Sequence, residues 1–443
     1  MLERITRRCA ALLAVFAVLA GLGAAARAQE NPTVVIDQAG EKTYKAAIQR
    51  FGGVGDALSE SFREEIGKGL DFSGLFSALS PQAFLASDVT RALGAQVVCP
   101  DWRQIGADAL VAGTLRSEAG GVGVEFEVWD VARCQKLLSK RFAAARDEVR
   151  LARRVADEVV GAFTGKPGVS STEVAFISNR SGAKELYLMN VDGSNVRQVT
   201  RNKTINEFPS WGPDGDTLLY TSYREARMPG LYVLSRSGRS PGRVFKNLRP
   251  GSSIYRGVID PSGQKVAVVA SVDGATKIFT LDRNGANPRQ LTTGKSLEVS
   301  PSWSPDGSRI AFVSDRTGGP QIYVMNADGS NQRRVTFQGG YNTGANWSPD
   351  GKWIAYESRV GGQFDIWLTD PEGTTNVPLV ENPSTDEGAS WSPDGRKLVF
   401  SSKRRGRSDL YVIDVGGGNA RRITQGEGDD TSPAWGPYRP ELR

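Results

Sequence analysis

The sequence contains no histidine among its 443 residues, and this absence excludes several kinds of site. A Ser-His-Asp hydrolase would have no general base, and zinc or copper sites built on imidazole are not possible. Cysteine is nearly as scarce, with three residues, so a cage of four thiolates is also excluded. Enzymes of these classes do not fit the chain, and carboxylate chemistry is what stays open.

Long apolar runs are missing too, apart from one near the start. Ala10–Leu22 follows three arginines and precedes Ala26-Arg-Ala28, which has the small-x-small pattern of a signal peptidase site. A membrane anchor is the alternative, but the run is shorter than the ~20 residues that a spanning helix needs. We predict a signal peptide over residues 1–28, export to the periplasm, and no transmembrane segment in the mature chain.

The three cysteines divide between the signal peptide and the mature chain. Cys9 would leave with the signal, so Cys99 and Cys134 remain. An even number of cysteines in an exported chain favours a disulfide. Two separate buried thiols are the alternative, and the sequence alone does not decide between them.

The chain carries only a modest excess of positive charge. The formal net charge is +6, and the predicted cleavage would halve it by removing four arginines and one glutamate. The basic residues are scattered, apart from the loop Lys403–Arg407. Neither a phosphate-tracking stripe nor a nucleic-acid module is indicated, so we expect no nucleic-acid partner.

A phrase repeated at one spacing dominates the second half of the sequence. Trp-Ser-Pro-Asp-Gly occurs at Trp303–Gly307, Trp347–Gly351 and Trp391–Gly395, with each Trp 44 residues after the last. Weaker copies occur at Trp211–Gly215 and Ile259–Gly263. A period of roughly 40–50 residues made of short strands is typical of a β-propeller.

The number of blades follows from one buried strand in each repeat. Six such strands are predicted, at Val174–Ser178, Leu218–Ser222, Val266–Ala270, Ile310–Ser314, Ile354–Ser358 and Leu398–Ser402. The first copy lacks a Trp-bearing strand before it, whereas Ser432–Trp435 has no repeat after it. We predict that this last strand completes the first blade, so that the ring closes without an open edge.

Several turns between strands faintly resemble calcium loops, among them Asn190–Gly193, Asp282–Gly285 and Asn326–Gly329. A calcium loop of the helix-loop-helix type needs carboxylates at alternating positions and a distal glutamate, and none of these turns supplies both. Hairpin turns are the better interpretation. We predict no metal and no cofactor.

Residues 29–166 have a different pattern and predict a small α/β domain. Thr33–Asp37, Ala109–Leu115 and Val122–Trp129 are typical of strands, whereas Leu58–Leu70 and Asp147–Phe163 have helical periodicity. The predicted fold is therefore an α/β N-terminal domain followed by an all-β six-bladed β-propeller over residues 167–443.

Polar side chains recur just before the Trp-bearing strand of each repeat, where one blade is expected to connect to the next. We expect these loops to meet around one mouth of the central channel. The candidate residues are Glu207, Phe208, Tyr255, Arg256, Glu298, Val299, Asn342, Thr343, Asp386, Glu387, Asp430 and Thr431. Their carboxylates predict an acidic rim suited to a basic segment or a cation, although loop tips are also polar in general.

Two carboxylate pairs in the same place leave an enzyme open as the alternative. Asp386-Glu387 and Asp429-Asp430 are the residue types that glycosidic acid/base chemistry uses. The runner-up function is thus an exported propeller enzyme that acts on polysaccharide. A structural propeller with unidentified partners is a third possibility.

Taken together, the signal peptide, a domain starting with Thr33-Val-Val-Ile-Asp37 and six Pro-Asp-Gly-type repeats resemble the TolB family over nearly the whole mature chain. The resemblance implies a non-enzymatic periplasmic component of the Tol-Pal system. Its propeller would bind the lipoprotein Pal, and its role would be outer-membrane integrity and constriction during division. The chain departs from the family pattern at Lys45–Phe51 and in its cysteine pair.

The resemblance also implies a second binding segment at the mature N-terminus, which would engage TolA. The matching residues are Gln29, Glu30, Asn31, Pro32, Thr33, Val34, Val35, Ile36 and Asp37. We expect this segment to pair with a partner strand by β-addition. Coupling between the two binding sites is a further hypothesis.

Overall fold

The computed structural model describes residues 43–439, except 86–87, 91–92, 95–96, 226–227, 241, 243–244, 246–247, 249–251 and 273. The predicted signal peptide, Cys9 and the predicted segment Gln29–Asp37 lie outside the described residues. Within the described ranges, no helix has the length and apolar character that crossing a bilayer requires.

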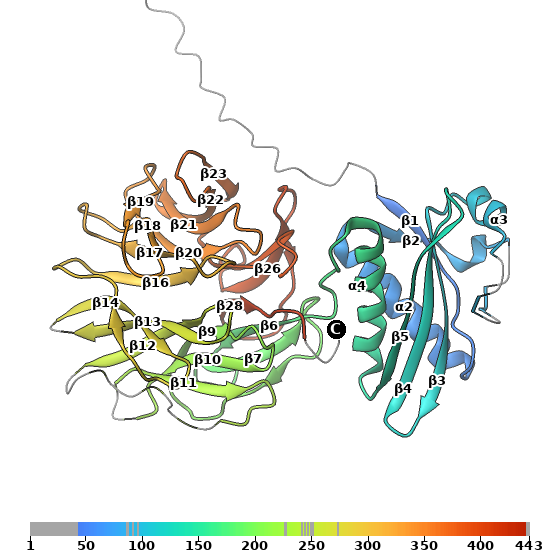
Figure 1. The fold of residues 1–443 in the computed structure, drawn as a ribbon, viewed down its shortest axis with the longest axis horizontal. Coiled ribbons are helices and arrows are strands. Elements are labelled where there is room, and N and C mark those ends of the chain that lie inside the picture. The colour runs from blue at the N-terminus through green and yellow to red at the C-terminus, as the bar shows by residue number, and fades with distance from the viewer. Residues whose placement is uncertain are drawn as a thin grey trace, which may run out of the picture. The chain divides into compact units, whose positions relative to one another are not determined.

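The N-terminal region is a five-stranded sheet with helices, in the strand order β2-β1-β3-β4-β5 (Figure 1). Its elements are β1 (Tyr44–Ile48), α2 (Asp56–Ser73), β2 (Phe76–Ala78), the 3-10 turn η1 (Pro81–Ala83), α3 (Cys99–Gln104), β3 (Ala109–Glu118), β4 (Gly121–Asp130), β5 (Gln135–Ala145) and α4 (Glu148–Thr164). The predicted helices and the strands β3 and β4 are present, whereas β1 and β5 were not predicted. The boundary between residues 166 and 167 stays a prediction.

Alternation along the strands explains how both faces of this sheet are covered. Ala46 and Ile48 belong to the core that includes residues of α2 and α4, whereas Ala47 packs in a separate cluster with Trp102 of α3. Successive strand residues point to opposite faces, so α2 and α4 cover one face and α3 covers the other (Figure 1).

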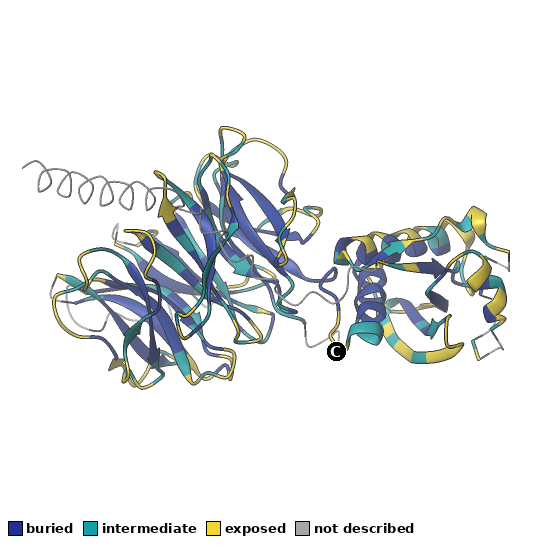
Figure 2. Cartoon of the chain, turned by 90° about the horizontal axis from the view of Figure 1, so that it is seen from above, coloured by how far each residue is buried: buried dark blue, intermediate teal, exposed yellow. Residues whose placement is uncertain are grey.

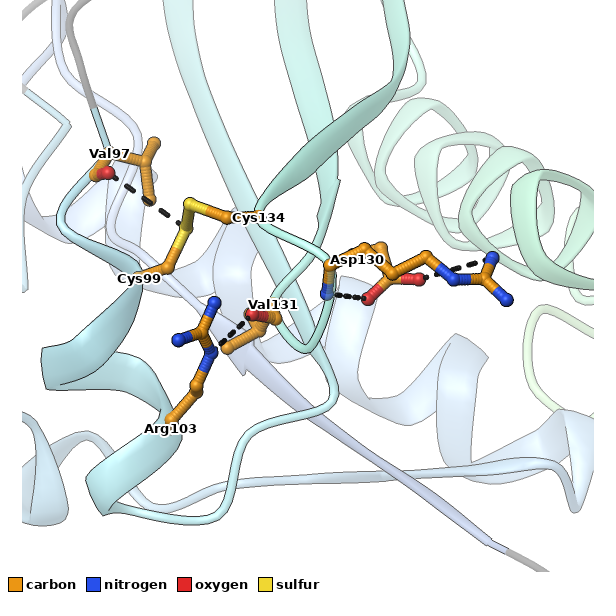
Figure 3. The surroundings of a disulfide bond; sticks show 7 residues. Val97, Cys99, Arg103, Asp130, Val131 and Cys134 are labelled. Atoms are coloured by element: carbon orange, nitrogen blue, oxygen red, sulfur yellow. Dashed lines mark hydrogen bonds and ion pairs between the residues drawn. A yellow bond between two sulfur atoms is a disulfide. The ribbon is translucent and has the colours of Figure 1, made fainter.

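One disulfide joins α3 to the turn between β4 and β5. Cys99 begins α3, and Cys134 lies in the turn with a left-handed φ of 53°. Arg103 Nε donates a hydrogen bond of 2.9 Å to the carbonyl oxygen of Val131 beside it (Figure 3). Cys99 and Cys134 are therefore paired across segments that are 35 residues apart, as the even-number argument predicted.

The second region is a propeller of six antiparallel sheets, which confirms the predicted fold (Figure 1). Blade 1 contains β28 (Asp430–Trp435), β6 (Glu173–Ser178), β7 (Glu185–Asn190) and β8 (Arg197–Gln198); blade 2 contains β9 (Asn206–Trp211), β10 (Thr217–Ser222) and β11 (Gly230–Ser235). Blade 3 contains β12 (Ser253–Ile259), β13 (Lys265–Val272), β14 (Ala275–Asp282) and β15 (Arg289–Gln290); blade 4 contains β16 (Glu298–Trp303), β17 (Arg309–Ser314), β18 (Gln321–Asn326) and β19 (Arg333–Arg334). Blade 5 contains β20 (Asn342–Trp347), β21 (Ile354–Val360), β22 (Gln363–Thr369) and β23 (Asn376–Val380); blade 6 contains β24 (Asp386–Trp391), β25 (Lys397–Ser402), β26 (Asp409–Asp414) and β27 (Arg421–Arg422).

The ring closes as predicted, through the last strand of the chain. β28 pairs with β6, so that Asp430 lies opposite Ser178 and Trp435 lies opposite Val174. Blade 1 therefore combines the first three propeller strands with the last one. This pairing covers the inner edge of β6, which would otherwise be open.

Each interface between neighbouring blades has its own buried apolar cluster in the described part of the chain. Three of the repeated tryptophans also link the blades, because the indole N–H groups of Trp211, Trp303 and Trp391 donate to a carbonyl of the preceding blade. Trp303 Nε1 donates to the Val258 carbonyl at 3.2 Å, and Trp391 Nε1 donates to the Asn346 carbonyl at 3.0 Å. The blade strands are mainly buried and the loops mainly exposed (Figure 2).

Candidate functional site

The candidate residues lie on the innermost strand of each blade, which lines the central channel. We number the positions of this strand from its first residue, five residues before the Trp of each repeat or before Ile259 in blade 3. First positions are Asn206, Ile254, Glu298, Asn342, Asp386 and Asp430, and second positions are Glu207, Tyr255, Val299, Thr343, Glu387 and Thr431. The predicted site therefore combines three structural positions with different environments, because Phe208 and Arg256 occupy the third.

The third position carries a left-handed backbone in all six blades. The φ angles are 51° at Phe208, 43° at Arg256, 55° at Ser300, 67° at Gly344, 71° at Gly388 and 48° at Ser432. The strand register shifts at this point in every blade, as in a β-bulge. Each inner strand is thus bent at the same level of the channel, and four blades accept a non-glycine residue in a conformation that costs free energy.

The predicted loop location is wrong for the first-position residues. Glu298, Asn342 and Asp386 are 0% exposed and Asp430 is 2% exposed, and each begins a strand. The inner strand starts five residues before the Trp, whereas the sequence pattern placed a loop there. The bulge adds a residue, so apolar alternation does not extend through the strand.

Three buried first-position carboxylates are held by arginines that repeat around the ring. Arg180 Nη2 lies 2.7 Å from Asp430, Arg316 Nη2 lies 3.2 Å from Glu298, and Arg404 Nη2 lies 3.3 Å from Asp386. Each of these arginines also donates from Nε to the serine at the end of its own blade's second strand.

Aromatic rings complete each of these arginine sites. The Arg404 guanidinium lies 4.4 Å from the centre of the Tyr411 ring and 5.6 Å from that of Phe400. Arg180 and Arg316 contact equivalent Phe and Tyr rings in blades 1 and 4. A cation that is stacked, hydrogen-bonded and ion-paired is fixed in place, so the Arg–carboxylate units act as structural clamps between strands.

The clamps change the predicted electrostatics of the channel mouth. Burial raises the pKa of Asp386, although Ser402 and Arg404 act in the opposite direction. Glu298 is held from a second side by Lys277, whose Nζ lies 2.6 Å from its carboxylate. These acids are neutralised inside the protein, so the open acidic rim predicted from the sequence does not include Glu298, Asp386 or Asp430.

The second-position side chains are half-buried, and five of the six line the channel. The channel has a volume of 780 Å³, and its wall includes Tyr255, Val299, Thr343, Glu387 and Thr431. Glu207 instead pairs with Lys184 at 3.3 Å. The structure thus brings five of the second-position residues around one cavity, together with Phe208 and Arg256 of the third position.

Exposed apolar side chains next to these strands were not predicted from the sequence. Ile205, Leu297 and Tyr341 immediately precede a first-position residue and are 46%, 47% and 41% exposed. Phe337, in the loop before Tyr341, is 63% exposed. These exposed apolar side chains come from the loops before three different blades. The signal was available in the sequence as an apolar residue at the end of a polar loop.

The described residues contain no group of three or more acidic or cysteine side chains arranged to hold a metal ion. The predicted N-terminal binding segment, Gln29–Asp37, lies outside the described residues. Partner contact by either predicted site stays a prediction.

Two family models match the chain. The TolB amino-terminal domain matches residues 32–137, and the TolB beta propeller domain matches residues 249–439. The chain is 36% identical over 294 residues to the Tol-Pal system protein TolB of Anaeromyxobacter dehalogenans, covering 66% of this chain and 67% of the relative.

Two further proteins are similar to the chain at lower sequence identity. The chain is 33% identical over 308 residues to a protein TolB homolog of Chlorobium luteolum, which covers 67% of this chain and 68% of that protein. The crystal structure of TolB from Acinetobacter baumannii is similar in fold, with a TM-score of 0.73, 24% identity, and coverage of 90% of this chain and 98% of that one.

Proposed function

Because the chain belongs to the TolB family, we propose that it is a non-enzymatic, periplasmic, protein-binding component of the Tol-Pal system. In this proposal the propeller binds the lipoprotein Pal at the channel mouth, and the segment Gln29–Asp37 binds TolA. The two contacts support outer-membrane integrity and envelope constriction during division.

The observation that carries the Pal proposal is the composition of the channel mouth. Second-position side chains surround the opening, and the exposed Ile205, Leu297, Phe337 and Tyr341 lie on loops at the same end of the blades. An interface needs apolar anchors that become buried, surrounded by polar groups. The bulged inner strands are rigid elements on which such a surface needs little reorganisation to bind.

The TolA proposal depends on the sequence of the N-terminal segment. Thr33-Val-Val-Ile-Asp37 is a short run of β-forming residues, and such a run can add to the edge of a partner's sheet through backbone hydrogen bonds. We extend the proposal to coupling: occupancy of the Pal site changes TolA affinity. Equal TolA affinity with and without Pal would refute the coupling and leave both separate contacts standing.

The Arg–carboxylate clamps argue against the alternative function, an enzyme that acts on polysaccharide. Glycosidic catalysis needs a proton donor and a second carboxylate that both reach the sugar. Asp386 and Asp430 are buried and paired with arginines. Of the two predicted carboxylate pairs, Glu387 is therefore the member that lines the channel.

Isothermal titration of the chain from Gln29 to Arg443 with the soluble domain of Pal from the same organism tests the proposal. We expect saturable one-to-one binding, and Leu297→Asp should weaken it at least about tenfold because it puts a charge at an apolar contact. Val196→Asp is the matched control, since Val196 is 39% exposed in the turn at the opposite end of blade 1. No heat at two temperatures, or equal loss in both variants, would count against this site.

A further inference from the structure

Two charged side chains in the channel break the repeat pattern of the blades. Arg256 occupies the third position, where the other blades have Phe208, Ser300, Gly344, Gly388 and Ser432. Glu357 pairs with the second-position residue of its blade, at a place where the other blades have Ile177, Thr221, Val269, Val313 and Ser401. In a repeat, each blade is a reference for the others, and both residues place a charge where no other blade has one.

Arg256 is a cation without a close counter-charge. Its guanidinium lies 4.9 Å from the centre of the Phe208 ring and lines the channel. No described carboxylate forms an ion pair with it within 4.0 Å. Burial lowers the pKa of Arg256, and the field of Glu357 partly opposes this shift. The cation is therefore desolvated on one side by an aromatic ring and open to the cavity on the other.

Glu357 reaches the channel because two blades have glycine at the bulge. Its Oε1 accepts a hydrogen bond of 2.7 Å from the Gly388 backbone N–H, and a Cβ at Gly344 would lie 2.4 Å from the same oxygen. Any larger residue at Gly344 would displace the carboxylate. Burial raises the pKa of Glu357, Glu387 adds to the shift, and Arg256 acts against it.

The order of the blades puts these charges on opposite walls. Phe208 and Arg256 come from blades 2 and 3, whereas Glu357 and Glu387 come from blades 5 and 6. In a closed ring of six, blade 2 faces blade 5 and blade 3 faces blade 6. The space between is the 780 Å³ channel, whose other lining residues include tryptophans, prolines and several serines. Asp260 also lines it, but its carboxylate accepts hydrogen bonds from the backbone N–H groups of Gln264 and Lys265. A mainly apolar cavity of this size with a few convergent polar groups is typical of a small-molecule site.

We propose that the channel binds a small zwitterion, namely a short peptide with a free amino and a free carboxyl end. The carboxylate lies against the Arg256 guanidinium, which offers two parallel donors, and the ammonium lies against Glu357 and Glu387. The tryptophan and proline walls contact the peptide side chains. A lone cation would meet Arg256 and a lone anion would meet two carboxylates, so the ligand that satisfies both walls carries both charges.

Three related dipeptides test this proposal by titration of the chain from Gln29 to Arg443. L-alanyl-L-alanine has both charges, its N-acetyl derivative lacks the ammonium, and its amide lacks the carboxylate. We expect each blocked compound to bind about 10- to 100-fold more weakly than the free dipeptide, the loss typical of a hydrogen bond to a charged group. Equal binding of the free and acetylated compounds would reduce the site to an anion site and overturn the proposal, as would equal binding of the free compound and the amide.

Substitutions then assign each charge to its wall. Arg256→Gln should weaken the free dipeptide about 10- to 100-fold and leave the amide unchanged, whereas Glu357→Gln should weaken the free dipeptide and leave the acetylated compound unchanged. Glu148→Gln and Arg201→Gln are matched controls outside the channel lining and should bind like the parent protein. Unchanged dipeptide binding in both channel variants would place the ligand elsewhere and refute the proposal.

Thermal midpoints separate binding from folding in these variants. Arg256 and Glu357 are desolvated charges, so neutral replacements should keep or raise the midpoint. Arg256→Lys, which keeps the charge and loses the bidentate fork, should bind with intermediate affinity and replaces Arg256→Gln if that variant fails to fold. The probes do not involve Pal, so a negative result here leaves the proposed function standing.

Discussion

The N-terminal α/β region and the propeller reach stability by different routes. In the α/β region, residues from β1, α2, β3, β4 and α4 share one continuous core, and a disulfide fixes a peripheral turn to it. In the propeller, the apolar residues form a separate cluster at each blade interface. The propeller thus divides its hydrophobic stabilisation among the blade interfaces.

The buried acids of the propeller illustrate this difference. Blades 1, 4 and 6 use an Arg–carboxylate clamp, whereas blade 5 has the amide of Asn342 at the same position. The α/β region has no such repeated position, so its specificity comes from the shape of one core. The following predictions test this contrast, from the largest expected change to the smallest.

Removing a clamped acid should have the largest effect. Glu298→Ala leaves Lys277 and Arg316 without their carboxylate, and Lys277 has a side chain only 4% exposed. We expect a loss of about 3–5 kcal/mol in the free energy of unfolding, measured by denaturant titration with tryptophan fluorescence. Asn342→Ala, which removes an uncharged amide in the neighbouring blade, should cost about 1–2 kcal/mol. Equal losses in the two variants would show that the Arg–carboxylate clamp contributes no more to stability than the uncharged amide does.

Breaking the disulfide should affect the α/β region and spare the propeller. The double variant Cys99→Ser with Cys134→Ser releases segments 35 residues apart. Loop-closure entropy predicts a loss of about 3–4 kcal/mol. Calorimetry should show the transition of the α/β region at a lower temperature and the propeller transition unchanged. Mass measurement with and without reductant is the control, and two free thiols in the untreated protein would contradict the pairing.

The free energy of unfolding should depend on pH through the contacts between α4 and the segment that follows it. Asp157 is 2% exposed and accepts hydrogen bonds from the backbone and side chains of Ser170 and Ser171. Burial outweighs these bonds and raises the pKa of Asp157 to about 6. The folded protein then binds the proton more tightly than the unfolded chain does, so this contribution is complete below about pH 4 and is lost as the pH rises through about 6.

The expected change between pH 4 and pH 7 is a loss of about 2–3 kcal/mol from this group. Denaturant titrations across that range measure it, and Asp157→Asn should flatten the profile because it cannot ionise. A profile of the variant that parallels the parent would assign the pH dependence to other carboxylates. Other groups titrate in the same range, so the comparison is the difference between the two profiles.

Exchanging residues at the bulge should have the smallest effect and the most specific one. Ser300→Gly and Ser432→Gly place glycine where blades 5 and 6 already have it, and we expect a gain of about 0.5–1 kcal/mol from relief of the left-handed backbone. Gly388→Ser is the reverse exchange and should destabilise, since a Cβ there would lie 3.2 Å from Pro433 Cδ. Gains in the first two variants with no loss in the third would refute the backbone explanation.

The sequence predicted the repeat well because its signals are local. The 44-residue spacing of the tryptophans and the apolar second strands need only neighbouring residues, and the unmatched Ser432–Trp435 was sufficient to predict ring closure. Helix α4 was predicted from its apolar face and is capped by the Asp147 side chain. The short strand β1 was missed because Lys45 interrupts its apolar run, and its stability comes from parallel pairing with β2 and β3.

The site was harder to predict because its environment depends on distant residues. Asp430 is neutralised by Arg180, 250 residues away, and Glu298 by Arg316, 18 residues away. The pattern Ser-x-Arg after the second strand was available in the sequence at Ser178, Ser314 and Ser402, but its partner carboxylate became evident only with the fold. Glu357 was missed because its exposure to the channel depends on glycine in two other strands.

Ring closure by β28 also has a consequence for how the protein is made. β6 is among the first propeller strands to be synthesised, and its partner on the inner edge is the last strand in the described part of the chain. Until β28 arrives, a nascent chain carries an unpaired strand edge, the feature that promotes aggregation during folding. The propeller therefore cannot close until β28 has been synthesised, and the interval before it is when a holding chaperone has most to protect.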